Sequence, residues 1–330
     1  MNSLTAKVIK DYDIPIQAVS NKHMEYALTE FREFDKYKDA FFFAKKYIET
    51  EGLNTEQFDA KTHEVSDRCI QAVMNLDLYK YFSMKNLPVL DKETTPFPQY
   101  SNGLDIYKNQ NNGKRFISID LTHANIQSLK FADALFEPKF ADQVDNFAEF
   151  LEHFGTCTNY YLKQYMSNSK RMRQIIFGNL NPKRQQHMER YMVESLIKEL
   201  IDQKVLKPED FYGYTTDEVI LNETPNTIVL AYNKFDSIYN IATGGDIVDE
   251  DNISKELTVH IEDFTLEKLE PYDFWVKKDH YGDILSIKKV PIVYYLQVLK
   301  HLNNKPVVEE DTMFLYEKLP CKFITELWDD

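Results

Sequence analysis

Carboxylates occur in two segments whose residue types could support metal chemistry. Asp120 ends the β-type run FISID at residues 116–120, and Asp217 and Glu218 are adjacent in YTTDEVIL at residues 214–221. Carboxylates at the ends of neighbouring strands can share divalent cations, which prefer oxygen ligands. Two such ions about 4 Å apart activate an attacking oxygen and stabilise a leaving phosphate oxygen. The pattern therefore favours two-metal phosphoryl-transfer chemistry.

The segment between them, SKRMRQIIFGNLNPKRQ at residues 169–185, has the pattern of an amphipathic basic helix. At about 100° per residue, Lys170, Arg173 and Phe177 share one face. The opposite face holds three apolar side chains, those of Met172, Ile175 and Ile176. Because cations pair with phosphates and an aromatic ring stacks on a base, the first face suits a nucleoside triphosphate.

Each of these signals also has a purely structural explanation. An Asp at a strand end is often a turn or cap residue, and acidic pairs are common in a chain with 53 Asp and Glu residues. A basic helix face is usually solvated, and Phe177 would ordinarily lie in a core. The functional interpretation depends on the three segments occurring together and in this order.

That order, over residues 116–221, resembles motifs A, B and C in the palm and fingers of family A DNA polymerases. Motif A of that family starts with a metal-binding Asp, which Asp120 matches. Motif C reads His-Asp-Glu-Val, and residues 216–219 match it except at Thr216. The family's motif A also has a Glu five residues after its Asp, where this chain has Asn125, so the sugar-discrimination device differs.

The basic helix resembles the fingers helix of the family, which carries basic residues and an aromatic residue next to a Gly. Lys170, Arg173 and Phe177-Gly178 match these positions. The resemblance implies that Lys170 and Arg173 neutralise the triphosphate and that Phe177 stacks near the base pair, with Tyr214 as the alternative for stacking. Asn125 is then expected at the nucleotide, in place of the family's Glu.

The resemblance further implies a nucleotidyltransferase, a small template-directed DNA polymerase in which a primer 3′-hydroxyl attacks the α-phosphate of a nucleoside triphosphate. Asp120 and Asp217 would hold two Mg²⁺ ions, or Mn²⁺ in their place, and Glu218 would assist or orient. Contacts with the phosphates of a primed nucleic acid are expected from three further cations, Arg171, Lys183 and Arg184.

Two alternatives remain open from the sequence. The chain could be a non-catalytic protein, either a nucleic-acid-binding accessory factor or a structural component of a viral assembly. It could also be a metal-dependent nuclease, because that chemistry uses the same carboxylates.

The positions of apolar, Pro and Gly residues predict an α+β fold without internal repeats. We expect a helical region at 1–85, an extended connection at 86–114, a palm and fingers core at 115–232 and a β-rich region at 233–330. Helices are predicted at 21–51, 55–84, 122–136, at most of 141–203 and at 292–302, and the short runs after Pro208, including residues 226–232, are predicted as antiparallel strands.

Composition restricts the partners and the location. The net charge is −14, but residues 163–190 contain seven basic residues and one acidic residue, Glu189. A nucleic-acid partner is therefore expected at this basic segment, and we expect an accessory protein or a homo-oligomer to support processivity. No apolar run approaches the roughly 18 residues of a membrane span, and no signal-peptide core is present. We expect a cytoplasmic protein, in the host cell cytoplasm if it is viral, that does not contact membranes.

Overall fold

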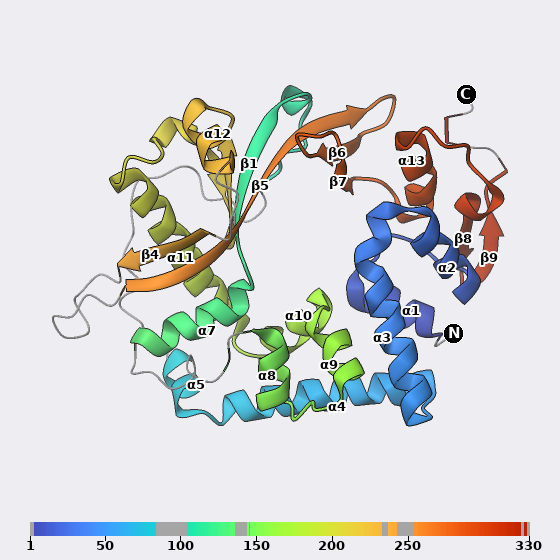
Figure 1. The fold of residues 1–330 in the computed structure, drawn as a ribbon, viewed down its shortest axis with the longest axis horizontal. Coiled ribbons are helices and arrows are strands. Elements are labelled where there is room, and N and C mark those ends of the chain that lie inside the picture. The colour runs from blue at the N-terminus through green and yellow to red at the C-terminus, as the bar shows by residue number, and fades with distance from the viewer. Residues whose placement is uncertain are drawn as a thin grey trace. The chain divides into compact units, whose positions relative to one another are not determined.

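A computed structural model describes residues 3–83, 104–135, 144, 146–232, 237–242, 254–324 and 327–328. The chain packs as two compact units, both discontinuous in sequence (Figure 1). Unit 1 comprises Met1–Ala72, Ala148–Gly178 and Lys288–Asp330, and unit 2 comprises Val73–Phe147 and Asn179–Ile287. The predicted core at 115–232 therefore contributes to both units, because residues 148–178 pack with the amino-terminal helices. Residues 86–103 of the predicted extended connection lie outside the described residues.

Unit 1 is mainly helical. Its helices are α1 (Leu4–Tyr12), α2 (Asn21–Glu30), α3 (Asp35–Glu51), α4 (Thr55–Met74), α8 (Phe147–His153), α9 (Tyr160–Ser167), α10 (Lys170–Gly178) and α13 (Tyr295–Leu302). A hairpin of β8 (Met313–Tyr316) and β9 (Leu319–Lys322) completes it. The helix predicted at 21–51 is interrupted at Phe31, whose backbone is extended, and ends as expected at Gly52 with a φ of 63°.

Unit 2 is built on an antiparallel sheet of β1 (Arg115–Leu121), β2 (Phe211–Tyr214), β3 (Glu218–Asn222), β5 (Ser254–Leu269), β6 (Phe274–Lys278) and β7 (Ile284–Lys288). The spatial order is β2-β3-β1-β5-β6-β7, and β4 (Ser237–Ala242) pairs with the first part of β5. Its helices are α5 (Asp77–Phe82), α7 (Ala124–Leu135), α11 (Pro182–Asp202) and α12 (Pro225–Tyr232). The α+β class is confirmed.

Strands β2, β3, β1 and β5 of this sheet follow a split βαβ pattern. The strand β1 lies between β3 and β5 and is antiparallel to both, whereas β2 follows β1 in sequence but pairs only with β3. Helices precede β2 and follow β3, so strand, helix, hairpin, helix and strand alternate as in ferredoxin-like folds. Antiparallel pairing brings the carboxyl end of β1 beside the turn that joins β2 to β3.

Apolar residues fill one face of the sheet near the start of β1. Phe116 packs in a buried cluster with Phe264, Ile220 and Trp275, and Ile106 from the segment before β1 belongs to the same cluster. The ring centroids of Phe116 and Phe264 are 6.1 Å apart. This end of the face is therefore closed to ligands.

The other face of the sheet is buried as well. Ile117, Ile119 and Ile261 are at most 7% exposed. Helix α12 contacts both β1 and β5, and α7 contacts β5. In Figure 1, α11 and α12 lie to the left of β1 and β5. These helices contact the strands whose apolar side chains form this face, and at the start of β1 Arg115 pairs with the buried Asp263 of β5.

One predicted strand is wrong. Residues 226–232, which contain the β-branched run Thr227-Ile228-Val229, form most of helix α12. Thr224 and Thr227 exchange backbone-to-hydroxyl hydrogen bonds of 2.8 and 3.3 Å, and Pro225 occupies the first helical position. This reciprocal cap outweighs the strand propensity of the run. None of the described helices combines the length and the apolar character that a membrane span needs.

Candidate functional site

Asp120 and Glu218 are register partners on β1 and β3. Their side chains therefore leave the same face of the sheet, with Cβ atoms about 4.5–5.5 Å apart. Ser118 lies two residues before Asp120 and shares this face. Its Oγ donates a hydrogen bond to Glu218 Oε1 at 2.7 Å. Ser118 is buried and Asp120 is exposed, so a buried hydroxyl fixes the Glu218 carboxylate beside an accessible one.

Asp217 lies in the tight turn between β2 and β3. The Thr215 amide donates to the Glu218 carbonyl oxygen at 2.8 Å, which closes the turn around Thr216 and Asp217. The hydroxyls of Thr215 and Thr216 each donate to Asp217 Oδ1 at 3.3 Å. The turn is tied to β1, because the Leu121 amide donates to the Asp217 carbonyl oxygen at 2.9 Å. The backbone of Asp217 thus lies beside the carboxyl end of β1.

Strand β5 adds two polar residues to the same face. His260 lies opposite Asp120, and Glu262 lies two positions further along the strand. Burial raises the pKa of the Tyr107 phenol, and the negative charges of Glu218 and Glu262 raise it further. Along β1 this face is apolar at Phe116, and from Ser118 onward it is lined by the acidic residues Glu262, Glu218 and Asp120. The sequence alone assigned no role to His260 or Glu262.

Glu189 is a buried carboxyl group beside this edge. It lies on α11, is 6% exposed, and accepts a hydrogen bond of 3.0 Å from Asn125 Nδ2 at the start of α7. Burial raises the pKa of Glu189 to about 7, the charge of Asp217 adds to the rise, and the Asn125 hydrogen bond opposes it. In the sequence, Glu189 is merely the one acid in a basic segment.

Asn125, which was expected at the nucleotide, donates a hydrogen bond to Glu189 in the described structure. Its amide links α7 to α11, where it orients Glu189 toward Asp217. Gln185 lies one helical turn before Glu189 and is buried, and its Nε2 has no hydrogen-bond partner among the described residues. Gln185 and Glu189 are four residues apart on α11, and this helical spacing is the sequence signal that could have indicated them as neighbours.

The first turn of α11 carries Lys183 and Arg184. Asn181 caps the helix, with its side chain accepting from the Arg184 amide at 3.3 Å, and Pro182 follows in the first turn. Lys183 is exposed and Arg184 is half-buried. Both cations belong to unit 2, like the carboxylates, but they point away from Glu189 because they precede it by five and six residues on the helix.

The basic helix α10 belongs to unit 1. Lys170 is exposed, Arg171 is half-buried, and the half-buried Arg173 donates from Nη1 to the Ser167 carbonyl oxygen at 3.0 Å. Burial lowers the pKa of the Arg173 guanidinium, and the nearby Tyr12 opposes this shift. The expectation that these cations share a cleft with the carboxylates concerns the two units together and stays a prediction.

Phe177 and Tyr214, the residues predicted to stack on a base, are both buried. Phe177 is 1% exposed and packs on Phe150, with ring centroids 5.3 Å apart, so its face is not accessible to a base. Tyr214 is 5% exposed, and its hydroxyl donates to Glu194 Oε1 at 2.8 Å. The apolar face of α10 forms as expected at Met172 and Ile176, but the helix also buries Phe177 on a second side.

The carboxylate edge fits Mg²⁺ in the chemistry of its donors. Asp120, Asp217 and Glu218 offer hard oxygen ligands, and Asp120 is exposed. No group of three or more His, Cys, Asp or Glu side chains is placed to hold a metal ion within the described ranges. Mg²⁺ in nucleotide sites is commonly held by one or two carboxylates together with substrate phosphates and waters. Asp120, Asp217 and Glu218 supply carboxylates of the type that such a site uses.

Comparisons with known proteins give no match: no family model, no curated protein and no solved structure matches this chain.

Proposed function

We propose that this protein is a nucleotidyltransferase, a template-directed DNA polymerase that adds nucleotides to a primer by a two-metal mechanism. The observation that carries the proposal is the pairing of Asp120 with Glu218 beside the turn that holds Asp217. These residues come from the two segments that resemble motifs A and C. Glu218 is the register partner of Asp120, and the Asp217 carbonyl oxygen accepts a hydrogen bond from the Leu121 amide at the end of β1.

The residues of this edge have distinct parts in the proposed reaction. Asp120 and Asp217 would hold the two Mg²⁺ ions, or Mn²⁺ in their place, and Glu218, fixed by Ser118, would orient the site. When bound, the ions stabilise the attacking oxygen and the leaving pyrophosphate oxygen. Asn125 keeps the buried Glu189 carboxyl beside Asp217, so the local negative charge depends on whether Glu189 is protonated.

Cations from both units would bind the substrates. Lys170 and Arg173 are proposed to neutralise the triphosphate. Lys183 and Arg184 at the start of α11 are proposed to contact phosphates of the primed nucleic acid. Since Phe177 and Tyr214 are buried, base stacking has no assigned residue in this proposal.

A sheet that binds single-stranded nucleic acid without catalysis would need accessible aromatic residues. On this sheet the aromatic residues Phe116 and Phe264 lie in a buried cluster with Ile106 and Trp275. The accessible part of the same face is acidic instead. These features favour metal-dependent chemistry over a non-catalytic binding role, with a nuclease as the closest chemical alternative.

Incorporation of labelled deoxynucleotide into a primed template with Mg²⁺ tests the proposal. The wild-type protein should incorporate label, and Asp120→Asn and Asp217→Asn should each abolish incorporation while circular dichroism shows a retained fold. Glu209→Gln is the matched control, because Glu209 is an exposed carboxylate just before β2, at the opposite end of the β2–β3 hairpin from the turn. Incorporation that survives both Asp substitutions would refute the assigned catalytic roles.

A further inference from the structure

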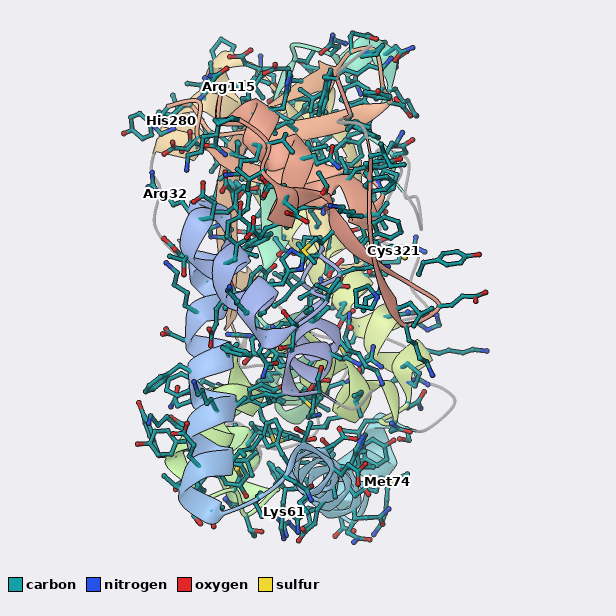
Figure 2. All side chains as sticks on the ribbon, turned by 90° about the vertical axis from the view of Figure 1, so that its right-hand side faces the viewer. Arg32, Lys61, Met74, Arg115, His280 and Cys321 are labelled. Carbon is teal, nitrogen blue, oxygen red and sulfur yellow. The ribbon has the colours of Figure 1, made fainter. Side chains whose placement is uncertain are left out.

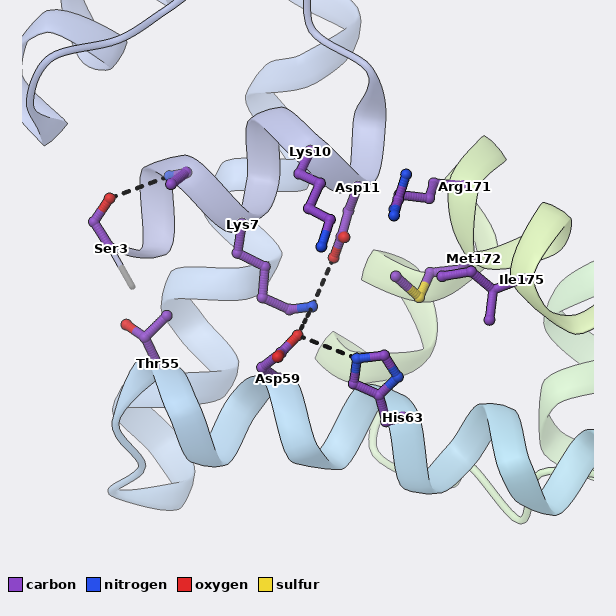
Figure 3. Close-up of a pocket in the computed structure, with 11 residues that line it drawn as sticks. Ser3, Lys7, Lys10, Asp11, Thr55, Asp59, His63, Arg171, Met172 and Ile175 are labelled. Carbon is purple, nitrogen blue, oxygen red and sulfur yellow. Dashed lines mark hydrogen bonds and ion pairs between the residues drawn. The ribbon is translucent and has the colours of Figure 1, made fainter. Parts of the chain in front are cut away.

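A pocket of about 160 Å³ lies within unit 1, between α1, α4 and α10 (Figure 3). Six ionisable side chains line it, namely three cations, two carboxylates and a histidine. They are Lys7, Lys10, Arg171, Asp11, Asp59 and His63. Ser3, Ala6 and Thr55 from the first turns of α1 and α4 also line it, where the positive ends of helix dipoles favour an anion.

Lys7 lines the pocket, but all three N–H donors of its ammonium group already have acceptors within the protein. Its buried Nζ lies 2.8 Å from Asp11 Oδ2 and 2.6 Å from Asp59 Oδ1, and it donates to Thr62 Oγ1 at 3.1 Å. An ammonium group has three N–H donors. These three acceptors use all of them, so Lys7 is part of the framework.

The two carboxylates of the pocket are occupied as well. Asp11 also accepts a hydrogen bond of 2.7 Å from the Tyr165 hydroxyl, and it is buried. Asp59 has His63 Nε2 at 3.7 Å in addition to Lys7. Because Lys7 lies against both acids, their repulsion of an incoming anion is reduced.

Two cations remain available. Lys10 is exposed on α1 and Arg171 is half-buried on α10, and neither side chain forms an ion pair or hydrogen bond with the part of the chain that the structure describes. Figure 3 shows Arg171 extending from α10 toward Lys10 and Asp11. Two cations from different helices that converge on one cavity, with the Thr55 hydroxyl on its wall, form a receptor for an oxyanion.

We propose that this pocket binds a phosphate group, held by Lys10 and Arg171. A cavity of about 150 Å³ accepts a molecule as large as benzene, so a phosphate group fits. Arg171 supplies a planar fork of donors and Lys10 a point charge, the combination that suits phosphate oxygens. The phosphate comes either from a free phosphate ion or from the 5′ end of a nucleic acid, and both present the same group to these side chains.

The test uses the full chain with labelled histidine and follows the imidazole NMR signals of His63, which His63→Gln identifies. Inorganic phosphate is titrated at constant ionic strength, and a 5′-phosphorylated oligonucleotide is compared with the same oligonucleotide bearing a 5′-hydroxyl. Saturable movement of the His63 signals is expected. Lys10→Met and Arg171→Met should each weaken the apparent affinity by about tenfold or more, as expected for a lost charge-assisted contact.

Lys61→Met is the matched control. Lys61, labelled in Figure 2, lies on α4 between Asp59 and His63. It pairs with Glu64 at 2.8 Å and is not among the residues that line the pocket. Its loss should leave the titration unchanged. Preference for the 5′-phosphorylated oligonucleotide over its 5′-hydroxyl twin would assign the nucleic-acid end as the source, and binding of inorganic phosphate alone would assign the free ion. The absence of saturable binding of both probes, or binding that persists in both pocket variants, overturns the proposal.

Discussion

The exposed Asp120 on β1 faces Glu218 on β3 as its antiparallel register partner, and a hydrogen bond from buried Ser118 fixes Glu218 in place. Residues from two distant segments therefore share one edge of unit 2. The proposed chemistry depends on this pairing, because it also positions Asp217. Asp217 immediately precedes Glu218, and its carbonyl oxygen accepts a hydrogen bond from the Leu121 amide of β1.

The Ser118 hydroxyl is predicted to affect metal dependence. Ser118→Ala removes the 2.7 Å hydrogen bond that orients Glu218. Loss of such a supporting partner typically costs about 10–100-fold in metal affinity or activity. We expect activity at limiting Mg²⁺ to fall by about tenfold and to recover at higher Mg²⁺.

Ser66→Ala is the control for this change, since Ser66 is a buried serine of unit 1 that donates to the Thr62 carbonyl oxygen at 2.9 Å. It should leave the Mg²⁺ dependence unaltered. An identical response of the two variants would show that the Ser118 hydroxyl does not affect the Mg²⁺ dependence of activity.

Folding stability should fall with rising pH because of Glu189. Burial and the charge of Asp217 raise the pKa of this carboxyl from 4.5 to about 7. The folded state therefore binds the proton more tightly than the unfolded state, and the stabilisation is complete below pH 4.5 and lost as the pH rises to 7. The loss amounts to about 3 kcal/mol in the free energy of unfolding.

Urea unfolding between pH 4.5 and 8 measures this dependence. Glu189→Gln should flatten it, whereas Asp202→Asn, which removes an exposed carboxylate at the end of the same helix, should not. Asn125→Ala should move the loss of stability to higher pH, because the Asn125 hydrogen bond lowers the pKa of Glu189. An unchanged slope in Glu189→Gln would show that other groups cause the dependence.

We predict that the buried Phe177 ring contributes to the free energy of unfolding. It is 1% exposed and packs on Phe150, so Phe177→Ala should reduce the free energy of unfolding by about 3–5 kcal/mol. Phe177→Leu, which keeps most of the buried volume, should cost less. Chemical denaturation distinguishes this from a stacking role, in which the alanine variant would keep its stability and show only a raised KM for nucleotide.

Lys183 and Arg184 are predicted to determine part of the salt dependence of nucleic-acid binding. Replacing both with Met should lower affinity for all sequences similarly and reduce the slope of log affinity against log salt by about 2 on duplex DNA. Lys198→Met, an exposed cation further along α11, is the control. Equal slopes for the double variant and the wild type would show that the first turn of α11 does not contact phosphates.

Local sequence patterns predicted the elements around the carboxylates. The β-type run FISID was sufficient for β1, and the β-rich run that begins at Tyr214 was sufficient for β3. The Asn181-Pro182 pair was sufficient for the start of α11. These features depend on neighbouring residues and are visible in a single sequence.

Features that depend on tertiary packing could not be read in the same way. A helical wheel places Phe177 beside Lys170, but α10 is enclosed on more than one side and buries the ring against Phe150. Glu189 becomes distinctive only because α7 and α11 bring it beside Asn125 and Asp217. The return of residues 148–178 to unit 1 likewise depends on long-range contacts.

The most direct test of the central claim is the length of an end-labelled primer on a longer template after incubation with Mg²⁺ and deoxynucleoside triphosphates. The account predicts extended primers with the wild-type chain and with Glu209→Gln, and unextended primers with Asp120→Asn and with Asp217→Asn. Shortened primers would indicate a nuclease at the same carboxylates. Primers left unchanged by the wild-type chain, or extended by the two Asp variants, would contradict the claim that Asp120 and Asp217 form a nucleotidyl-transfer centre.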